Sequence, residues 1–337
     1  MGGRSELFCK GKDHMIYSFN IWKGKEGERS LELSLLLGKH IASLLLILLA
    51  GVALVRLKVL KPGQEVALNK VILYAVTPCS VVNAYQMEYS AERLLSLGIA
   101  LGGSAFFFLM AFLLSRLLRK PLKLEPVEEA GLIYSNCGNL ILPLASALLG
   151  REGVFYASSY LLIQTVLIWT HGRSLISGEK GDWKKALLNV NLLSVLLGLA
   201  LFLLRISLPD ILMTAVSGMS AMLGPLSMLL LGMMLAASPL KEIFARPRAW
   251  LLALLRLAGL PLVSLLLLAL TGILRWDLAR GVLLIPLLQG AAPCAAMVSQ
   301  FAQLYDKRPD WAGSINVLST ILCVITLPLM AALYALL

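Results

Sequence analysis

The chain has few charged residues, and its apolar segments carry no acidic residue near their centres. Only 15% of its 337 residues are Asp, Glu, Lys or Arg, and 58% are hydrophobic, whereas a typical soluble domain is about a quarter charged. The mean hydropathy of +0.82 agrees with this imbalance. The composition therefore indicates a membrane protein rather than a soluble one. The net charge of +11 is scattered through short loops, so we predict no nucleic-acid partner.

Motifs of enzymes and metal sites are also missing. We find no His-Glu-x-x-His, no phosphate-binding Gly loop ending in Lys-Ser/Thr, and no nucleophile with a matching base. Four of the five cysteines fall inside apolar segments, where small apolar fillers are expected: Cys79, Cys137, Cys294 and Cys323. The sequence therefore predicts neither an enzyme nor a metal or cofactor site.

A secretory signal is absent from the start of the chain, because residues 1–30 are polar and basic without an apolar core. We interpret them as a disordered leader, or as sequence upstream of a later start such as Met15.

Ten apolar segments follow, and each is close to the roughly 20 residues that a helix needs to cross a bilayer. They are Leu33–Leu57, Val66–Gln86, Leu94–Leu118, Val127–Leu149, Val154–Gly172, Ala186–Leu204, Ile211–Ala237, Ala249–Leu274, Gly281–Leu304 and Trp311–Leu337. We predict an all-α membrane protein with ten transmembrane helices. Its first five-helix unit covers residues 31–172, a cytoplasmic linker covers 173–185, and the second unit covers 186–337.

Alternate loops differ in their content of Lys and Arg. One set is rich in both, whereas the opposite set holds only Arg93, Arg151, Arg205, Arg275 and Arg280. Because basic loops stay in the cytoplasm, both termini are predicted to face outward from the cell membrane.

An internal repeat accompanies this pattern, at an offset of about 150 residues. Gly51, Pro62 and Pro78 recur as Gly198, Pro209 and Pro225, and Gly131, Asn139 and Pro143 are matched by Gly281, Gln289 and Pro293. Since five is an odd number, the second unit must enter the membrane from the opposite face. Inverted repeats of this kind are typical of alternating-access carriers, whose site lies near the bilayer midplane.

The fourth segment contains Tyr134-Ser-Asn-Cys-Gly-Asn-Leu-Ile-Leu-Pro143. Its Pro and Gly disfavour a continuous helix, and non-helical backbone at this depth must line a cavity or lie inside protein. A half-helix that starts after the break points free N–H groups at that cavity. We therefore predict binding of an anion such as a carboxylate, with contributions from Asn136, Cys137, Gly138, Asn139 and Pro143.

The ninth segment carries the matching sequence Pro286-Leu-Leu-Gln-Gly-Ala-Ala-Pro-Cys294. We predict a second broken helix there that crosses the first, with Gln289, Ala292, Pro293 and Cys294 at the site. The alternative is that the amides only join helices to one another, as Asn and Gln do in many membrane proteins.

Other polar positions are weaker candidates. Residues that can line the cavity, or relieve a kink, are Thr77, Ser80, Asn83, Gln164 and Ser227. Arg256 lies well inside the eighth segment, and we interpret it as a side chain that snorkels to the cytoplasmic surface.

The chain resembles the auxin efflux carrier family of membrane transporters in its short, prokaryote-like form. The resemblance covers roughly residues 33–337 and is carried by four motifs: Asn136-Cys-Gly-Asn139 with Leu-Ile-Leu-Pro143, Pro225-Leu-Ser-Met-Leu-Leu-Leu-Gly232, Ala292-Pro293 leading to Tyr305, and Ser319-Thr-Ile-Leu-Cys-Val-Ile-Thr-Leu-Pro328. It implies ten helices with crossed, proline-broken fourth and ninth helices, and often a homodimer. Members move small organic anions, and the plant proteins bind the carboxylate at positions that match Asn136, Asn139, Pro143 and Pro293.

We expect a permease for a small mono- or dicarboxylate. A ligand-binding membrane sensor without transport is a second hypothesis, and a sodium-coupled organic anion symporter is a third. The absence of a central carboxylate counts against the third, because ion-coupled carriers usually keep one.

Overall fold

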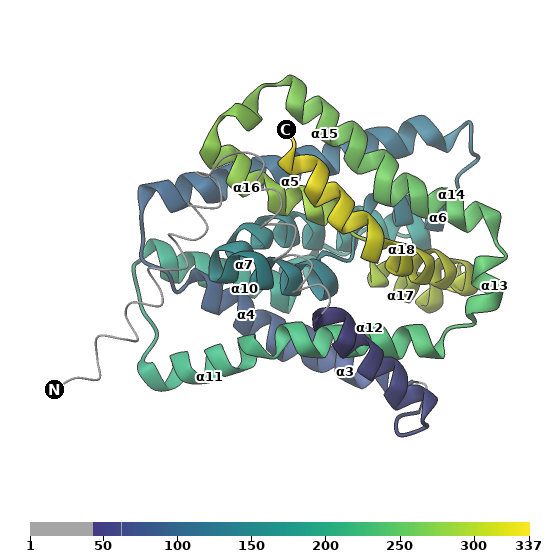
Figure 1. The fold of residues 1–337 in the computed structure, drawn as a ribbon, viewed down its shortest axis with the longest axis horizontal. Helices are drawn as coiled ribbons and strands as arrows, with labels where there is room; N and C mark the ends of the chain where they lie inside the picture. Colours follow the sequence, from purple (N-terminus) through teal and green to yellow (C-terminus); the bar gives the residue numbers. More distant parts are fainter. Residues whose placement is uncertain (1–42, 62) are drawn as a thin grey trace.

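The computed structural model describes residues 43–61 and 63–337, and these residues are almost entirely helical (Figure 1). The predicted leader and the start of the first apolar segment lie outside the described residues. Within the described part, the only β-type pairing is an isolated bridge between Ser135 and Cys294. Among the described residues, six helical stretches are long and apolar enough to cross a membrane: Glu65–Tyr85, Ala91–Arg119, Cys137–Ser177, Asp210–Ala237, Pro247–Leu270 and Pro309–Ala335. Shorter apolar helices cover Ser43–Arg56 and Val190–Leu203.

The individual helices follow the predicted segments closely, with two interruptions. After Ser43–Arg56 come α3 (Glu65–Val71), the π turn η1 (Ile72–Val76), α4 (Thr77–Tyr85), α5 (Ala91–Arg119), α6 (Pro126–Ile133), the π turn η2 (Cys137–Ile141), α7 (Leu142–Leu167), the π turn η3 (Ile168–Gly172) and α8 (Arg173–Ser177). The second half contains α9 (Trp183–Leu187), α10 (Val190–Leu203), α11 (Asp210–Ala221), α12 (Leu223–Ala237), α13 (Leu240–Phe244), α14 (Pro247–Leu254), the π turn η4 (Leu255–Gly259), α15 (Leu260–Leu270), the short turn η5 (Ile273–Arg275), α16 (Asp277–Gly290), α17 (Ala296–Leu304) and α18 (Pro309–Ala335).

Local sequence explains several helix boundaries. The Ser90 side chain accepts a hydrogen bond from the Arg93 N–H at the start of α5, and Glu125 and Glu128 form a capping box at the start of α6. The long stretch Cys137–Ser177 contains Gly150, which has φ of 58° and ψ of −135°. A residue without a Cβ adopts this conformation at little cost, so the chain reverses there between the predicted fourth and fifth segments.

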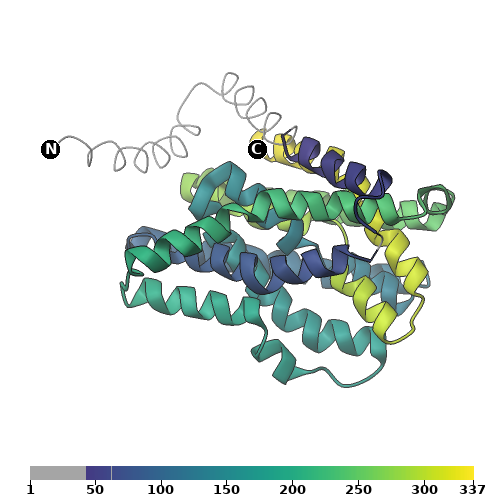
Figure 2. The same cartoon turned by 90° about the horizontal axis from the view of Figure 1, so that it is seen from below.

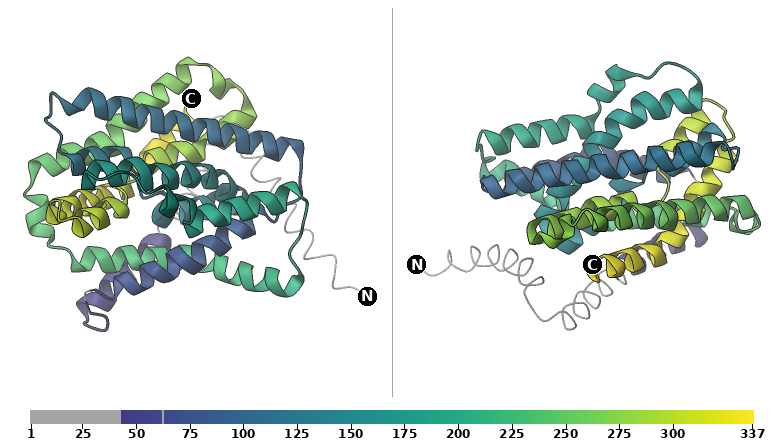
Figure 3. Two further views of the ribbon diagram at one scale, coloured as in Figure 1. Left: turned by 180° about the vertical axis from the view of Figure 1, so that it is seen from behind. Right: turned by 90° about the horizontal axis from the view of Figure 1, so that it is seen from above.

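The helices form two packed groups (Figures 1 and 2). In one group α4 packs on α10 and α11, and α12 packs on α3; in the other, α5 packs on α7 and α16, and α14 packs on α18. Figure 3 shows α5 and α15 side by side along one face of the second group. Helix α7 contacts α4, α10 and α12, so it joins the two groups.

Close backbone approach holds the helix Ser43–Arg56 against α12. A Cβ on Gly232 would lie 2.0 Å from the Leu48 carbonyl oxygen, and one on Gly51 would lie 2.3 Å from the Leu229 carbonyl oxygen. Small residues at such contacts are typical of helix pairs in membranes. Large apolar side chains remain exposed on the outer faces, among them Leu113, Leu197 and Leu266. A lipid environment accounts for this exposure, and the chain is a multi-pass membrane protein.

Candidate functional site

Two interrupted helices meet at the centre of the second group. Helix α6 ends at Ile133 and the next helical turn begins at Cys137, whereas α16 ends at Gly290 and α17 begins at Ala296. The two intervening stretches pair in antiparallel fashion: the Asn136 N–H donates to the Pro293 carbonyl at 2.8 Å, and the Ala295 N–H donates to the Tyr134 carbonyl at 3.0 Å. These bonds satisfy backbone groups that the breaks remove from the helices.

The first break lies before Pro143 rather than at it. The non-helical residues are Tyr134, Ser135 and Asn136, and Pro143 lies inside the helical run that follows, after the π turn η2. Proline is tolerated there because the π turn already departs from regular α-helical hydrogen bonding near the start of the half-helix. In the ninth segment the break covers Ala291–Ala295, and Pro286 is enclosed within α16.

Gln164 of α7 stabilises the first break from the side. Its Oε1 accepts hydrogen bonds from the Ser135 N–H at 3.0 Å and from the Ser135 hydroxyl at 3.1 Å. Its Nε2 donates to the Ser135 carbonyl at 2.7 Å and lies 3.2 Å from the Cys137 sulfur. The amide therefore takes the place of a neighbouring strand for Ser135, which gives Gln164 a structural role at the site.

Two further side chains support the second break. The Cys294 N–H donates to the Ser319 hydroxyl of α18 at 3.1 Å. The motif that begins at Ser319 does not by itself predict this contact. The Arg256 Nε donates to the Ala292 carbonyl at 3.0 Å, and its Nη1 donates to the Leu132 carbonyl at 2.9 Å. The prediction that Arg256 snorkels to the surface is therefore wrong, since the side chain is 1% exposed and faces the crossing.

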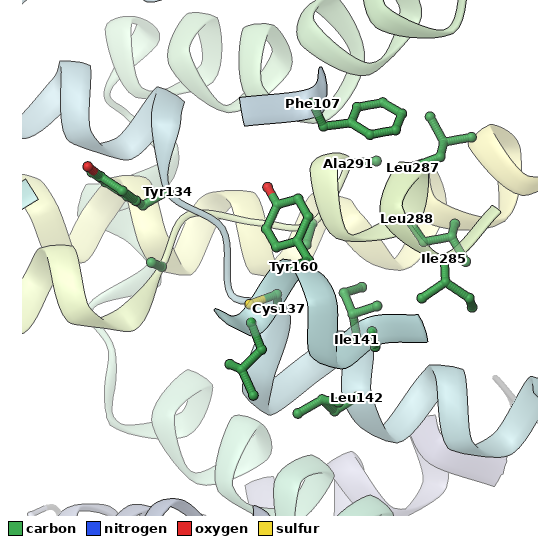
Figure 4. Close-up of a cluster of buried hydrophobic side chains, with 14 of the residues drawn as sticks. Phe107, Tyr134, Cys137, Ile141, Leu142, Tyr160, Ile285, Leu287, Leu288 and Ala291 are labelled. Carbon is green, nitrogen blue, oxygen red and sulfur yellow. The ribbon is translucent and has the colours of Figure 1, made fainter. Parts of the chain in front are cut away.

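The half-helix after the first break begins beside open space. Cys137, Gly138 and Asn139 supply its first N–H groups, which have no carbonyl one turn earlier in the same helix. Nothing lies within 4 Å of a Cβ built on Gly138. Asn139 is partly exposed, and its Nδ2 donates to the Asn69 Oδ1 of α3 at 3.2 Å. Figure 4 shows the extended chain leading from Tyr134 to Cys137, with the ring of Tyr160 near Cys137.

The crossing brings together Asn136, Cys137, Ala292, Pro293 and Cys294, which are buried. Gln289 is also buried, but its Nε2 donates to the Ala157 carbonyl of α7 at 3.0 Å, so it joins α16 to α7. This contact matches the alternative interpretation of an amide that holds helices together.

The remaining candidates lie on α4 and α12. The Asn83 Nδ2 donates to the Ser220 hydroxyl at 3.2 Å, and Ser220 in turn donates to Ser80 at 3.2 Å, so this pair is engaged with α11. Thr77 on α4 and Ser227 on α12 are buried, and the Ser227 hydroxyl has no hydrogen-bond partner among the described residues.

Residues 43–61 and 63–337 contain no group of three or more His, Cys, Asp or Glu side chains placed to hold a metal ion. Cys79, Cys137, Cys294 and Cys323 are free thiols.

Comparison with known proteins agrees with the membrane architecture. A family model described as "Membrane transport protein" matches residues 37–185 and 179–331, which together span most of the chain. No curated protein matches the chain significantly. Because the family model covers well over half of the sequence, the chain belongs to this membrane transport protein family, the auxin efflux carrier family that its motifs indicate.

Proposed function

We propose that this membrane transporter carries a small organic anion with a carboxylate group, by alternating access. The observation that supports the proposal most strongly is the crossing of two broken helices beside open space at Gly138. The half-helices that begin at Cys137 and Ala296 each present free N–H groups and about half a positive charge at their first turns.

In this proposal the substrate-binding residues lie in the first helical turn after each break. Backbone N–H groups of Cys137, Gly138 and Asn139 bind one carboxylate oxygen, and the Asn139 amide adds a side-chain donor. Asn136 and the Ala292–Cys294 stretch position these donors through the paired backbone, and Pro143 lies in the half-helix that presents them. Asn139 now bonds to Asn69 of the other helix group, so a bound carboxylate competes with that bond.

The architecture in this proposal consists of ten membrane crossings in two inverted five-helix units. The interrupted helices lie at matching positions, α6–α7 in the first unit and α16–α17 in the second, as in other inverted-repeat carriers. Movement of the group that contains the crossing, relative to α3 and α12, exposes the site to each side in turn. Loop charges favour a cell-membrane location with both termini outside.

The direct test is counterflow of radiolabelled carboxylates in liposomes that contain the purified chain. Asn139→Ala should abolish counterflow while the protein still folds, because the variant removes a donor at the proposed site. Asn191→Ala is the matched control, since Asn191 is a buried amide on α10 outside the site.

Full counterflow by Asn139→Ala contradicts the site assignment. Saturable binding of a carboxylate without any flux contradicts transport and favours a sensor. Flux that requires sodium favours a symporter.

A further inference from the structure

Arg256 is a buried cation at the crossing, and the function proposed above does not use it. Its side chain is 1% exposed and lies about 14 Å along the stretch Pro247–Leu270 from its start. This depth is near the middle of a hydrocarbon core about 30 Å thick. Arg256 lies within the π turn η4, and π turns within helices are frequent at functional sites.

The guanidinium group uses only part of its hydrogen-bonding capacity on the protein. Nε and Nη1 donate to the carbonyls of Ala292 and Leu132, near the carboxyl ends of α16 and α6, where helix dipoles favour a cation. Nη2 is buried and has no hydrogen-bond partner among the described residues. Since an unpaired buried donor on a charged group is costly, Nη2 is a place where a ligand can bind.

No carboxylate neutralises Arg256 within the described part of the chain. None of the ion pairs found there includes it. Its electrostatic neighbours are the thiols of Cys137 and Cys294 and the hydroxyl of Tyr160, which also lies close enough to interact with the guanidinium group as a hydrogen-bond acceptor. These groups ordinarily carry no charge at pH 7. At the crossing, the partial positive charges of the two half-helix N-termini and the partial negative charges of the C-terminal ends of α6 and α16 offset one another, at about half a charge each. Arg256 therefore leaves one net positive charge in a medium where an uncompensated charge is expensive.

We propose that Arg256 is the counter-charge of the transported anion, and that its single charge restricts the substrate class to monocarboxylates. This inference rests on the proposed transport function. A carboxylate oxygen accepts a hydrogen bond from Nη2, and one bound negative charge leaves the site neutral. A dicarboxylate brings a second charge that no described side chain at the crossing compensates.

The test measures binding to the purified full chain by thermal shift at constant ionic strength. Probes are acetate, butyrate, benzoate and indole-3-acetate, with malonate, succinate and phthalate as ligands carrying two carboxylates. The wild type should bind a monocarboxylate most tightly. Arg256→Gln should weaken the binding of that ligand at least about 30-fold. Arg256→Lys, which keeps the charge, should weaken its binding less than about fivefold. Ser264→Ala, whose hydroxyl bonds only within its own helix, should bind like the wild type.

A purely structural role for Arg256 gives a different pattern. In that case Arg256→Gln weakens the binding of the carboxylate and of its neutral primary amide by the same factor. If Arg256 is the counter-charge, only the binding of the carboxylate is weakened. Equal loss for both ligands overturns the proposal, as does unchanged binding by folded Arg256→Gln. If Arg256→Gln does not fold, tighter binding of a dicarboxylate to the wild type still overturns it. If no carboxylate binds or is transported by the wild type, the proposed function itself fails.

Discussion

Replacement of Gln164 by Leu tests whether the crossing depends on side-chain support. Gln164 accepts from the Ser135 N–H and hydroxyl and donates to the Ser135 carbonyl. Gln164→Leu keeps the side-chain volume roughly constant but leaves two buried backbone groups of Ser135 without partners. Each such group costs about 1–3 kcal/mol, and in a membrane the competing continuous helix satisfies both. We therefore expect the free energy of unfolding to fall by about 3 kcal/mol.

The assay is reversible unfolding of the purified chain in bicelles. Thr165→Val is the control, because Thr165 is the next residue on the same helix and is also buried. If Gln164→Leu and Thr165→Val have the same free energy of unfolding, Gln164 does not stabilise the break. An average interhelical bond in a membrane contributes only about 0.6 kcal/mol, so a loss that small also contradicts the role of Gln164 in supporting the break.

Two other predictions concern a half-buried ion pair and the open space at the site. Arg248 is half-exposed and forms two short hydrogen bonds, 2.6 and 2.7 Å, to the Glu128 carboxylate, whose side chain is 1% exposed. Arg248→Ala should lower the free energy of unfolding by about 1–3 kcal/mol in the same assay, because the buried carboxylate keeps only the Glu125 N–H and the Trp311 indole as donors. Glu128→Gln in the same background should restore part of the loss, whereas an unchanged free energy of unfolding in Arg248→Ala contradicts the prediction. Gly138→Cys, in a variant without other cysteines, should react with a small hydrophilic thiol reagent and be protected by a bound carboxylate, since space is open at Gly138; inertness of this thiol contradicts an accessible site.

The sequence predicts the helices well because each apolar segment is long and its breaks contain Pro, Gly or charge. Predicted Leu94–Leu118 corresponds to α5 at Ala91–Arg119, and predicted Ile211–Ala237 corresponds to Asp210–Ala237. Long apolar segments are a strong signal for membrane helices, because polar groups are poorly tolerated in contact with lipid. The meeting of the two interrupted helices also agrees with the prediction from the repeat.

Contacts between distant helices are much harder to predict from the sequence. Pro143 indicates the region of the break but not its place, because the non-helical residues 134–136 depend on Gln164 and on pairing with the second break. The short distance from Arg256 to the end of its segment predicts a surface position, whereas its partners are carbonyls more than thirty positions away along the chain. Gln289, matched to Asn139 by the repeat, is engaged with Ala157 instead. Positions that the predicted repeat matches therefore differ in their contacts.

The most direct measurement of the central claim is the distance from a bound carboxylate to the first turn of the half-helix. Solid-state NMR on protein labelled with ¹⁵N-cysteine, with ¹³C-carboxyl-labelled acetate or benzoate, reports the separation of the carboxyl carbon from the Cys137 amide nitrogen. The account predicts about 4 Å, as for an N–H···O hydrogen bond, and loss of the signal in Cys137→Ala. A saturated sample without any ¹³C–¹⁵N coupling would show that the anion binds elsewhere.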